Sequence, residues 1–186
     1  MRVPVELSKA LRLLNHGPTV LVASAHEGRR DVMAAAWNMP LDFSPPKVAV
    51  VIDKSTYTRA LIEASGEFLL AVPCAAQVDL VCGVGQHSGR DMDKFAHYGI
   101  ATAAASRVQA PLVEGCLAWL ECRIVPEPHN QQTYDLFLAE VIAAWAEDWA
   151  FKDGHWQDLP PEQRALHHLG GGSFLTSGGP VLQGRG

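Results

Sequence analysis

The feature that most constrains the fold is a pair of apolar segments joined by a short polar turn near the start of the chain. Residues 19–25 form one run of small and β-branched side chains, and residues 31–38 form another. The turn between them is centred on Gly28, and glycine readily adopts the backbone conformations of tight turns. The pattern predicts a β-hairpin whose second strand stops at Pro40, because proline cannot donate a backbone hydrogen bond.

Further apolar segments recur along the chain and are bounded by proline or glycine. Short connections between consecutive strands favour antiparallel pairing, since parallel strands need long crossover connections. The strands predicted in this way are 47–53, 67–72 and 116–125. Residues 133–148 fit two states. Their Ala, Leu and Glu content favours a helix, whereas Tyr134, Leu136 and Leu138 alternate as in a strand, and the pattern alone leaves the choice open.

Helices are expected to be few and short. The strongest candidate runs from about residue 56 to residue 65, with an apolar face of Tyr57, Leu61 and Ala64 and a closing Gly66. Together with the hairpin-forming strands, this predicts a mainly β fold, a small antiparallel barrel with a few short peripheral helices. The remaining helical segments expected are 5–15, 77–82 and 94–98, and a polar, glycine-bearing loop is expected at 83–93.

The bulk properties indicate one globular domain. The 186 residues contain 48% hydrophobic and 19% charged side chains, which argues against disorder. The net charge is −5, and the Lys and Arg residues do not cluster, which argues against a nucleic-acid partner. Without an apolar run of about 18 residues or a signal-peptide core, we expect no membrane association and a cytoplasmic location. Residues 149–186 lack a clear period and predict a tail that wraps the outside or reaches a partner subunit.

The four cysteines stand at positions 74, 82, 116 and 122. Their spacing matches no zinc-finger or Cys-x-x-Cys pattern, and each lies in an apolar run. They are therefore expected to be small buried thiols, and no metal site is predicted. Adjacent His167 and His168 do not change this, because no third ligand follows from their spacing.

A candidate phosphate site lies where the strand 47–53 meets the helix that follows. Ser55, Thr56 and Thr58 bring three hydroxyls to the helix N-terminus, which carries partial positive charge and free N–H groups. The competing interpretation is that one of these residues simply caps the helix.

Two other segments suit a flat, polar ligand. Trp37 follows Ala34-Ala35-Ala36, and small residues let a planar ring approach the backbone, although a tryptophan is more often part of a core. In the segment 88–95, Lys94 could donate to a ligand if Asp91 or Asp93 held it, and the alternative is a solvated loop. Gly83-Val-Gly85 does not form a dinucleotide fingerprint, because position 88 is Ser and the preceding residues look helical.

Taken together, these motifs resemble the flavin reductase-like family, an FMN-binding split β-barrel, and within it the flavoredoxin-like branch. The resemblance covers about residues 8–177 of one domain (1–186) with a flexible C-terminal tail. The matching motifs, in chain order, are Val32–Trp37, Ser44-Pro45-Pro46, Lys54–Thr58, Gly66–Phe68, Ser88–Phe95, Ala110–Leu112, Leu120–Arg123, His168–Gly171 and Phe174.

The resemblance implies an antiparallel, Greek-key-like barrel in which 133–148 is largely strand. It also implies non-covalent FMN, contacts of Trp37 and its neighbours with the flavin, and a phosphate held by the hydroxyls near residue 56. Asp31 stands where the family often has Asn, which exchanges an amide donor for a carboxylate. The implied cofactor-binding residues are Asp31, Ala36, Trp37, Asn38, Ser55, Thr56, Thr58, Ser88, Gly89, Lys94, His129 and Phe174.

The expected function is an FMN-binding oxidoreductase, an NAD(P)H-dependent flavin reductase with NADH or NADPH as a transient co-substrate. No catalytic side chain is predicted, because a flavin carries out hydride and electron transfer itself. The alternatives are a non-enzymatic FMN electron carrier and a ligand-binding barrel that has lost flavin. The family also implies a homodimer, with His129 and Phe174 at the subunit boundary, and a partner oxygenase or redox protein that accepts the electrons.

Overall fold

The predicted hairpin forms the starting edge of a curved antiparallel sheet. In the computed structural model, which describes residues 1–179, β2 (Val20–His26) pairs with β3 (Arg29–Ala35). Glu27 and Gly28 in the turn have φ of 48° and 76°. Positive φ at both central residues matches the right-handed twist of the flanking strands, as in type I′ hairpins.

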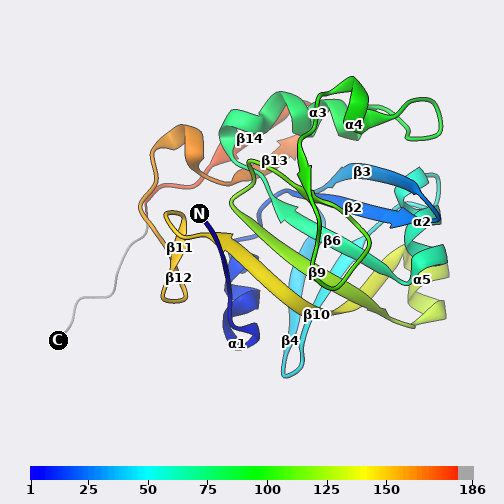
Figure 1. Cartoon of the computed structure of the whole chain (residues 1–186), viewed down its shortest axis with the longest axis horizontal. Helices are drawn as coiled ribbons and strands as arrows, with labels where there is room; N and C mark the ends of the chain where they lie inside the picture. The colour runs from blue at the N-terminus through cyan, green and yellow to red at the C-terminus, as the bar shows by residue number, and fades with distance from the viewer. Residues whose placement is uncertain (180–186) are drawn as a thin grey trace.

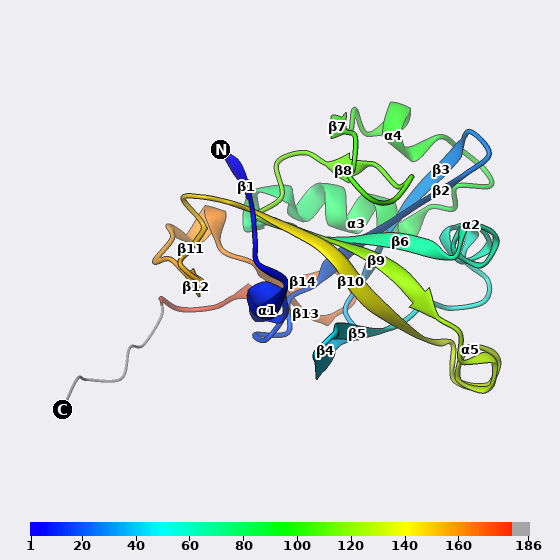
Figure 2. The ribbon, with the colours of Figure 1, turned by 60° about the horizontal axis from the view of Figure 1, so that its bottom comes forward.

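The sheet has eight strands and curls into a barrel that is split between β3 and β4 (Figures 1 and 2). The strand order is β3-β2-β6-β9-β10-β5-β4, and the short β1 pairs with β10. The fold is therefore mainly β and antiparallel, as predicted. The other strands are β1 (Arg2–Pro4), β4 (Asn38–Phe43), β5 (Pro46–Val51), β6 (Glu67–Val72), β9 (Ala118–Val125) and β10 (Leu136–Glu147).

Segment 133–148 is mostly strand despite its helical composition. β10 is twelve residues long and pairs with both β9 and β5, so sheet pairing on both edges decides its conformation. The first two residues of the segment, Thr133 and Tyr134, end a helix, α5 (Pro128–Tyr134), that the sequence did not predict, and Asp135 separates this helix from β10. Pro128 lies in its first turn, where proline is tolerated.

A second unpredicted element is β4. The sequence placed the end of the hairpin strand at Asn38 and a stop at Pro40, but Asn38 begins a new strand that pairs with β5. Pro40 is accommodated because β4 is an edge strand, with one side free of ladder hydrogen bonds, and because the register shifts between Pro40 and Asp42.

The helices lie outside the sheet, and α3 packs on β3. The predicted helix 56–65 is α2 (Tyr57–Ser65), capped by Thr56 and closed by Gly66 at φ 73°. Its buried face differs from the prediction: Thr58, Leu61 and Ile62 face inward and Ala64 is exposed. The other helices are α1 (Leu7–Ala10), which continues as a 3₁₀ turn over Leu11–Leu13, α3 (Val78–Gln86), preceded by a 3₁₀ turn over Ala75–Gln77, and α4 (Lys94–His97).

The end of α3 corrects the predicted loop 83–93. The helix continues through Gly83 and Gly85 to Gln86, so the loop begins at His87. Gly83 is needed there because a Cβ would overlap the ring of Tyr98, which follows α4. Close packing of α4 on α3 therefore outweighs the low helix propensity of glycine.

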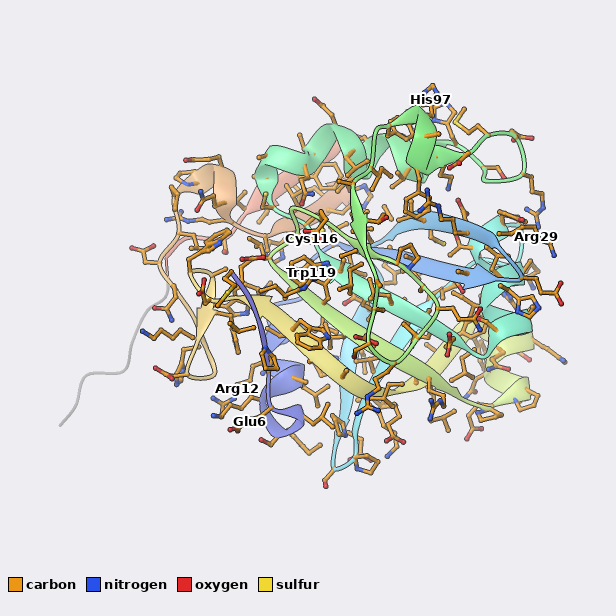
Figure 3. All side chains as sticks on the ribbon, in the orientation of Figure 1. Glu6, Arg12, Arg29, His97, Cys116 and Trp119 are labelled. Atoms are coloured by element: carbon orange, nitrogen blue, oxygen red, sulfur yellow. The ribbon has the colours of Figure 1, made fainter. Side chains whose placement is uncertain are left out.

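Strands β2, β6 and β9 carry nearly continuous apolar runs because both of their faces are buried. Val22, Phe68 and Leu120 point into the barrel, whereas Leu21 and Trp119 point to the other side, where α3, α4 and the segment 99–117 cover the sheet. Figure 3 shows Trp119 and Cys116 on this covered side. Two-sided burial explains why these three strands lack the alternation of a half-exposed sheet, which β10 shows.

The C-terminal segment wraps the outside of the barrel over the described residues 149–179, and 180–186 lie outside the described part. Over residues 1–179, no helix is long and apolar enough to cross a membrane.

The four cysteines are free, three are buried and Cys82 is half-buried. The remaining short elements are β7 (Thr102–Ala103), β8 (Leu112–Val113), β11 (Phe151–Lys152), β12 (His155–Trp156), a 3₁₀ turn over Pro161–Gln163, β13 (Leu166–Gly170) and β14 (Ser173–Thr176).

A buried carboxylate attaches the covering segment to the sheet. Glu121 on β9 is fully buried and accepts hydrogen bonds from the N–H groups of Ser106, Arg107 and Val108 and from the indole of Trp145. Burial alone would raise the pKa of Glu121, but these donors lower it below its usual value. The segment 106–108 therefore binds Glu121 in its ionised form.

We expect Glu121→Gln to reduce the free energy of unfolding at pH 7 by about 2–4 kcal/mol, because hydrogen bonds to a charged group are lost and buried donors lose their acceptor. Since the folded pKa lies below the unfolded one, this stabilisation is present above the unfolded pKa of about 4.3 and disappears as the pH falls through the folded pKa. Urea denaturation of the wild type and of Glu121→Gln at pH 7 and pH 4 measures this stabilisation. Glu114→Gln, which removes a surface ion pair with Arg2, should cost less than about 1 kcal/mol.

Candidate functional site

A cavity lies on the side of β3 that α3 covers, close to the β13–β14 hairpin. It has a volume of about 600 Å³, which is within the range of small-molecule sites. Its floor is Ala34-Ala35-Ala36, and its rim carries three aromatic side chains. The lining residues are Thr19, Met33, Ala34, Ala35, Ala36, Trp37, Val51, Asp53, Val81, Cys82, Gly85, Gln86, Tyr134, Asp135, His168, Gly171 and Phe174.

The aromatic rim is largely open to solvent. Trp37 is 76% exposed and Tyr134 is 60% exposed, so neither is a core residue. Phe174 contacts the ring of His168, with centroids 5.1 Å apart. Exposed aromatic rings beside an apolar cavity are suited to stacking on a planar ligand.

A smaller, more polar cavity of about 220 Å³ adjoins the large one. The two share Met33, Ala34, Gly85 and Gln86 as lining residues, so they form two lobes of one site. Gly85 stands at the junction, where a Cβ would contact the Cβ of Ala34 at 3.6 Å. The residues that line the small lobe alone are Asp31, Ser55, Thr56, Tyr57, Thr58, Val84, His87, Ser88 and Lys94.

The small lobe lies at the N-terminus of α2. Thr56 is the N-cap: its hydroxyl accepts from the N–H of Arg59 and donates to the carbonyl of Asp53. Among residues 1–179, the N–H groups of Tyr57 and Thr58 in the first turn find no acceptor. These donors and the helix dipole favour an anion at this position.

The loop after α3 closes the small lobe from the other side. Ser88 accepts from the N–H of Arg90, and Arg90 donates to the carbonyl of Ser55 at 2.6 Å, which joins the loop to the turn before α2. At Gly89 a Cβ would overlap the Asp31 carboxylate and the ring of Tyr57. Only glycine allows this close approach.

Asp31, Thr58 and Lys94 form a buried polar group beneath the small lobe. The Thr58 hydroxyl donates to Asp31 Oδ2 at 2.7 Å, and Lys94 Nζ lies 3.3 Å from Asp31 Oδ1. Lys94 also donates to the carbonyls of Val32 and Val84, at 2.7 and 3.1 Å. Burial lowers the pKa of Lys94 and the Asp31 charge acts in the opposite direction. One ammonium thus ties together β3, α3 and α4.

This geometry corrects two sequence-based expectations. Lys94 is held by Asp31, whereas Asp93 caps α4 by accepting from the N–H groups of Phe95 and Ala96. Thr58 is fully buried with its hydroxyl proton directed to Asp31, so its hydroxyl supports the lobe from below. Ser55, Thr56 and Ser88 remain hydroxyl residues that line the lobe.

The other predicted residues lie at the edges of the site. Ala36, Trp37 and Phe174 line the large lobe. Asn38 lies behind it, and its amide donates to the carbonyl of Pro18. His129 is exposed on α5, where its ring contacts Tyr134, and it is not among the lining residues.

A buried arginine positions the wall that carries Tyr134. Arg59 on α2 donates to the Asp135 carboxylate, to the carbonyl of Gln131 at 2.8 Å and to Glu63. Asp135 ends α5 in the left-handed conformation. These bonds connect α5 to α2.

Several residues that line the cavity were not predicted from the sequence. Thr19, Tyr134, Asp135 and His168 belong to three separate segments that only the folded chain brings together. Gly85 and Gln86 were assigned to a loop, and an amphipathic helix over 78–86 would have placed them beside β3. No local pattern marks Thr19.

A split barrel is the fold that this chain shares with flavin reductase-like proteins of known structure. A model of the flavin reductase like domain matches residues 11–160, and the chain therefore belongs to the flavin reductase-like, FMN-binding family. The resemblance predicted from the ordered motifs is confirmed.

Individual relatives agree with this assignment. The chain is 49% identical over 185 residues to the uncharacterized protein YddH of Escherichia coli K12, covering 98% of each chain. A crystal structure of an FMN-binding domain of a flavin reductases-like enzyme from Shewanella baltica OS155 is 47% identical, with a TM-score of 0.95 over 99% of this chain and 98% of that one. Flavoredoxin of Desulfovibrio vulgaris (Miyazaki F), 24% identical, shares the fold with a TM-score of 0.79 over 90% of each chain.

We expect Lys94→Met to lower the free energy of unfolding by about 3–5 kcal/mol, because it leaves the Asp31 carboxylate buried without its counter-charge. Adding Asp31→Asn removes that charge, so the double variant should be less unstable than the sum of the single variants by about 1–3 kcal/mol. Chemical denaturation of the four proteins measures this coupling. The exposed pair Asp42–Lys47 is the control, and Asp42→Asn with Lys47→Met should couple by less than about 1 kcal/mol. Equal coupling in the two pairs would contradict the role given to Asp31.

Proposed function

We propose that this chain binds FMN non-covalently across the two lobes and acts as an NAD(P)H-dependent flavin reductase. The observation that carries the proposal is the pairing of an apolar, aromatic-rimmed lobe with a small polar lobe at the N-terminus of α2. The first suits a planar ring and the second suits a phosphate. Membership of an FMN-binding family supports the same ligand.

The residues of both lobes fit such a ligand. Ala34, Ala35 and Ala36 leave the backbone of β3 accessible to a flat ring, with Trp37 beside it. The hydroxyls of Ser55 and Ser88 and the first-turn N–H groups of α2 offer donors to a phosphate. Asp31 and Lys94 compensate each other beneath this lobe, so Asp31 does not confront the phosphate as an isolated charge.

When bound, FMN supplies the hydride and electron transfer. The work left to the protein is to bind and orient the ring and to exclude water from its buried face. Trp37, Tyr134 and Phe174 provide aromatic surface over which a nicotinamide can dock transiently. This division of labour agrees with the absence of a predicted catalytic acid or base.

A non-enzymatic electron carrier is the second candidate. The exposure of Trp37 favours it, because an exposed aromatic at the rim of a flavin lobe gives a protein partner close access to the ring. A partner oxygenase or redox protein as the acceptor stays a prediction in either case. A barrel that has lost flavin is disfavoured by the open, connected lobes, which side chains have not filled.

An apolar strip on β4 supports the proposed homodimer. Met39, Leu41 and Phe43 alternate along this edge strand and are all exposed, Phe43 by 87%. The β4–β5 hairpin projects from the barrel, as Figure 1 shows. The register shift between Pro40 and Asp42 turns Phe43 to the opposite face of the hairpin from Met39, and exposed apolar side chains along an unpaired edge normally mark a contact surface. In this proposal the second copy covers the strip, and His129 and Phe174 lie near the boundary.

The test of cofactor binding compares FMN with riboflavin, which lacks the phosphate. We expect purified protein to be yellow or to bind FMN more tightly than riboflavin. Ser55→Ala should weaken FMN about tenfold and leave riboflavin unchanged, since a hydrogen bond to a charged group is worth roughly 1.5–3 kcal/mol and 1.4 kcal/mol is tenfold. Fluorescence titration measures both affinities. Ser8→Ala, on α1, is the control and should change neither.

Nicotinamide oxidation then separates the two candidate functions. A reductase oxidises NADH or NADPH, and the rate depends on FMN in the lobes. An electron carrier holds FMN equally well but oxidises neither nicotinamide until a partner reductase is added. A protein that binds no flavin at all would contradict both the reductase and the electron-carrier function.

The dimer is tested by light scattering, which should give twice the chain mass of 20.1 kDa. Phe43→Glu places a charge in the apolar strip and should shift the protein to the monomer. Leu7→Glu introduces the same charge at an apolar residue that is 40% exposed on α1 and should leave the mass unchanged. A Phe43→Glu protein that stays dimeric would show that β4 is not the interface.

A further inference from the structure

Unpartnered buried polar atoms are concentrated around one segment of the chain. In residues 1–179, all of them except Asp31 Oδ1 belong to the segment 16–19 or to residues bonded to it. Asn38 donates to the carbonyl of Pro18, and the His167 ring lies 3.1 Å from the carbonyl of Gly17. The atoms concerned are His16 Nδ1, Thr19 Oγ1, Asn38 Oδ1 and His167 Nε2.

Thr19 is the member of this group that lines the large lobe. It is 3% exposed, and its own N–H donates to the carbonyl of Leu166 at 2.7 Å, so its backbone is fixed between β2 and β13. Its hydroxyl has no hydrogen-bond partner among the described residues.

A buried hydroxyl without a partner is unfavourable, and nearly all such groups in folded proteins are satisfied. Valine has almost the same shape as threonine and would avoid this cost. A threonine at this position is therefore explained best if a ligand in the lobe supplies the missing partner.

The polar residues that line the large lobe include Thr19, Asp53, Asp135 and His168. Asp135 is paired with Arg59 and Lys54, so its charge is compensated. The ring of a flavin has an apolar dimethylbenzene edge and a polar pyrimidine edge with two carbonyl oxygens. A hydroxyl can donate to those oxygens, whereas the dimethylbenzene edge has no atom that accepts a hydrogen bond.

We propose that Thr19 donates a hydrogen bond to the pyrimidine edge of the bound flavin and so fixes which way the ring lies in the lobe. This rests on the proposed FMN site. It makes Thr19 a ring-binding residue, distinct from the hydroxyls that serve the phosphate.

The test uses Thr19→Val and Thr19→Ser in the full chain. Thr19→Val should raise the Kd for FMN and for riboflavin by the same factor, about three- to tenfold, because one neutral hydrogen bond to the shared ring is lost. The melting temperature of the flavin-free Thr19→Val protein should equal or exceed that of the wild type, since an unpaired hydroxyl has been removed. Thr19→Ser should retain wild-type affinity. The midpoint potential of flavin bound to Thr19→Val should be more negative, because a donor to the ring stabilises its reduced, electron-rich form.

The outcomes separate this proposal from the proposed function. A wild-type protein that binds neither flavin overturns both. Wild-type protein that binds FMN, with a Thr19→Val variant of unchanged affinity and potential, overturns only the role of Thr19. A Thr19→Val protein that melts earlier without flavin and binds it normally shows that the hydroxyl is structural, and also overturns the proposal.

Discussion

The geometry of the site depends on the carboxylate of Asp31. It receives the Thr58 hydroxyl from α2 and faces the ammonium of Lys94 from α4, while β3 supplies the carboxylate itself. Lys94 in turn binds the last turn of α3 through the carbonyl of Val84. Three helices are therefore placed relative to one strand by a single buried charge pair. A pair of this kind contributes little net stability, but it is costly to break, which makes the arrangement specific.

The barrel makes this arrangement possible because its central strands β2, β6 and β9 are buried on both faces. One face fills the interior of the barrel, and the other supports α3, α4 and the covering segment that Glu121 holds. Only where β3 and β4 fail to pair does the sheet open, and Trp37 lies in the connection between them. Ala35, Ala36 and Trp37, at this opening, all line the cavity.

Local sequence signals predicted the features that short-range interactions determine, namely turns, helix caps and helix ends. The turn at Gly28, the Thr56 cap and the Gly66 stop fixed the first hairpin and α2, and the order of motifs indicated the family. Contacts between distant segments were not predictable in the same way. β4 forms because β5 pairs with it, and the strand over 136–147 forms because two neighbours flank it. The partner of Lys94 was misassigned to nearby acids, because the true partner is 63 residues away. Thr19 has no local signature, and only its lack of a partner in the folded chain draws attention to it.

A substitution at Gly85 could change the ligand that such a site binds during evolution. It lies at the junction of the two lobes, where an alanine would only touch Ala34. A longer side chain at this one position would divide the space and leave a chamber large enough for a ring but cut off from the anion-binding turn. The absence of a side chain at Gly85 therefore decides whether one ligand can occupy both lobes. A lineage could exchange a nucleotide for an unphosphorylated aromatic compound through a single substitution there, with the barrel itself unchanged.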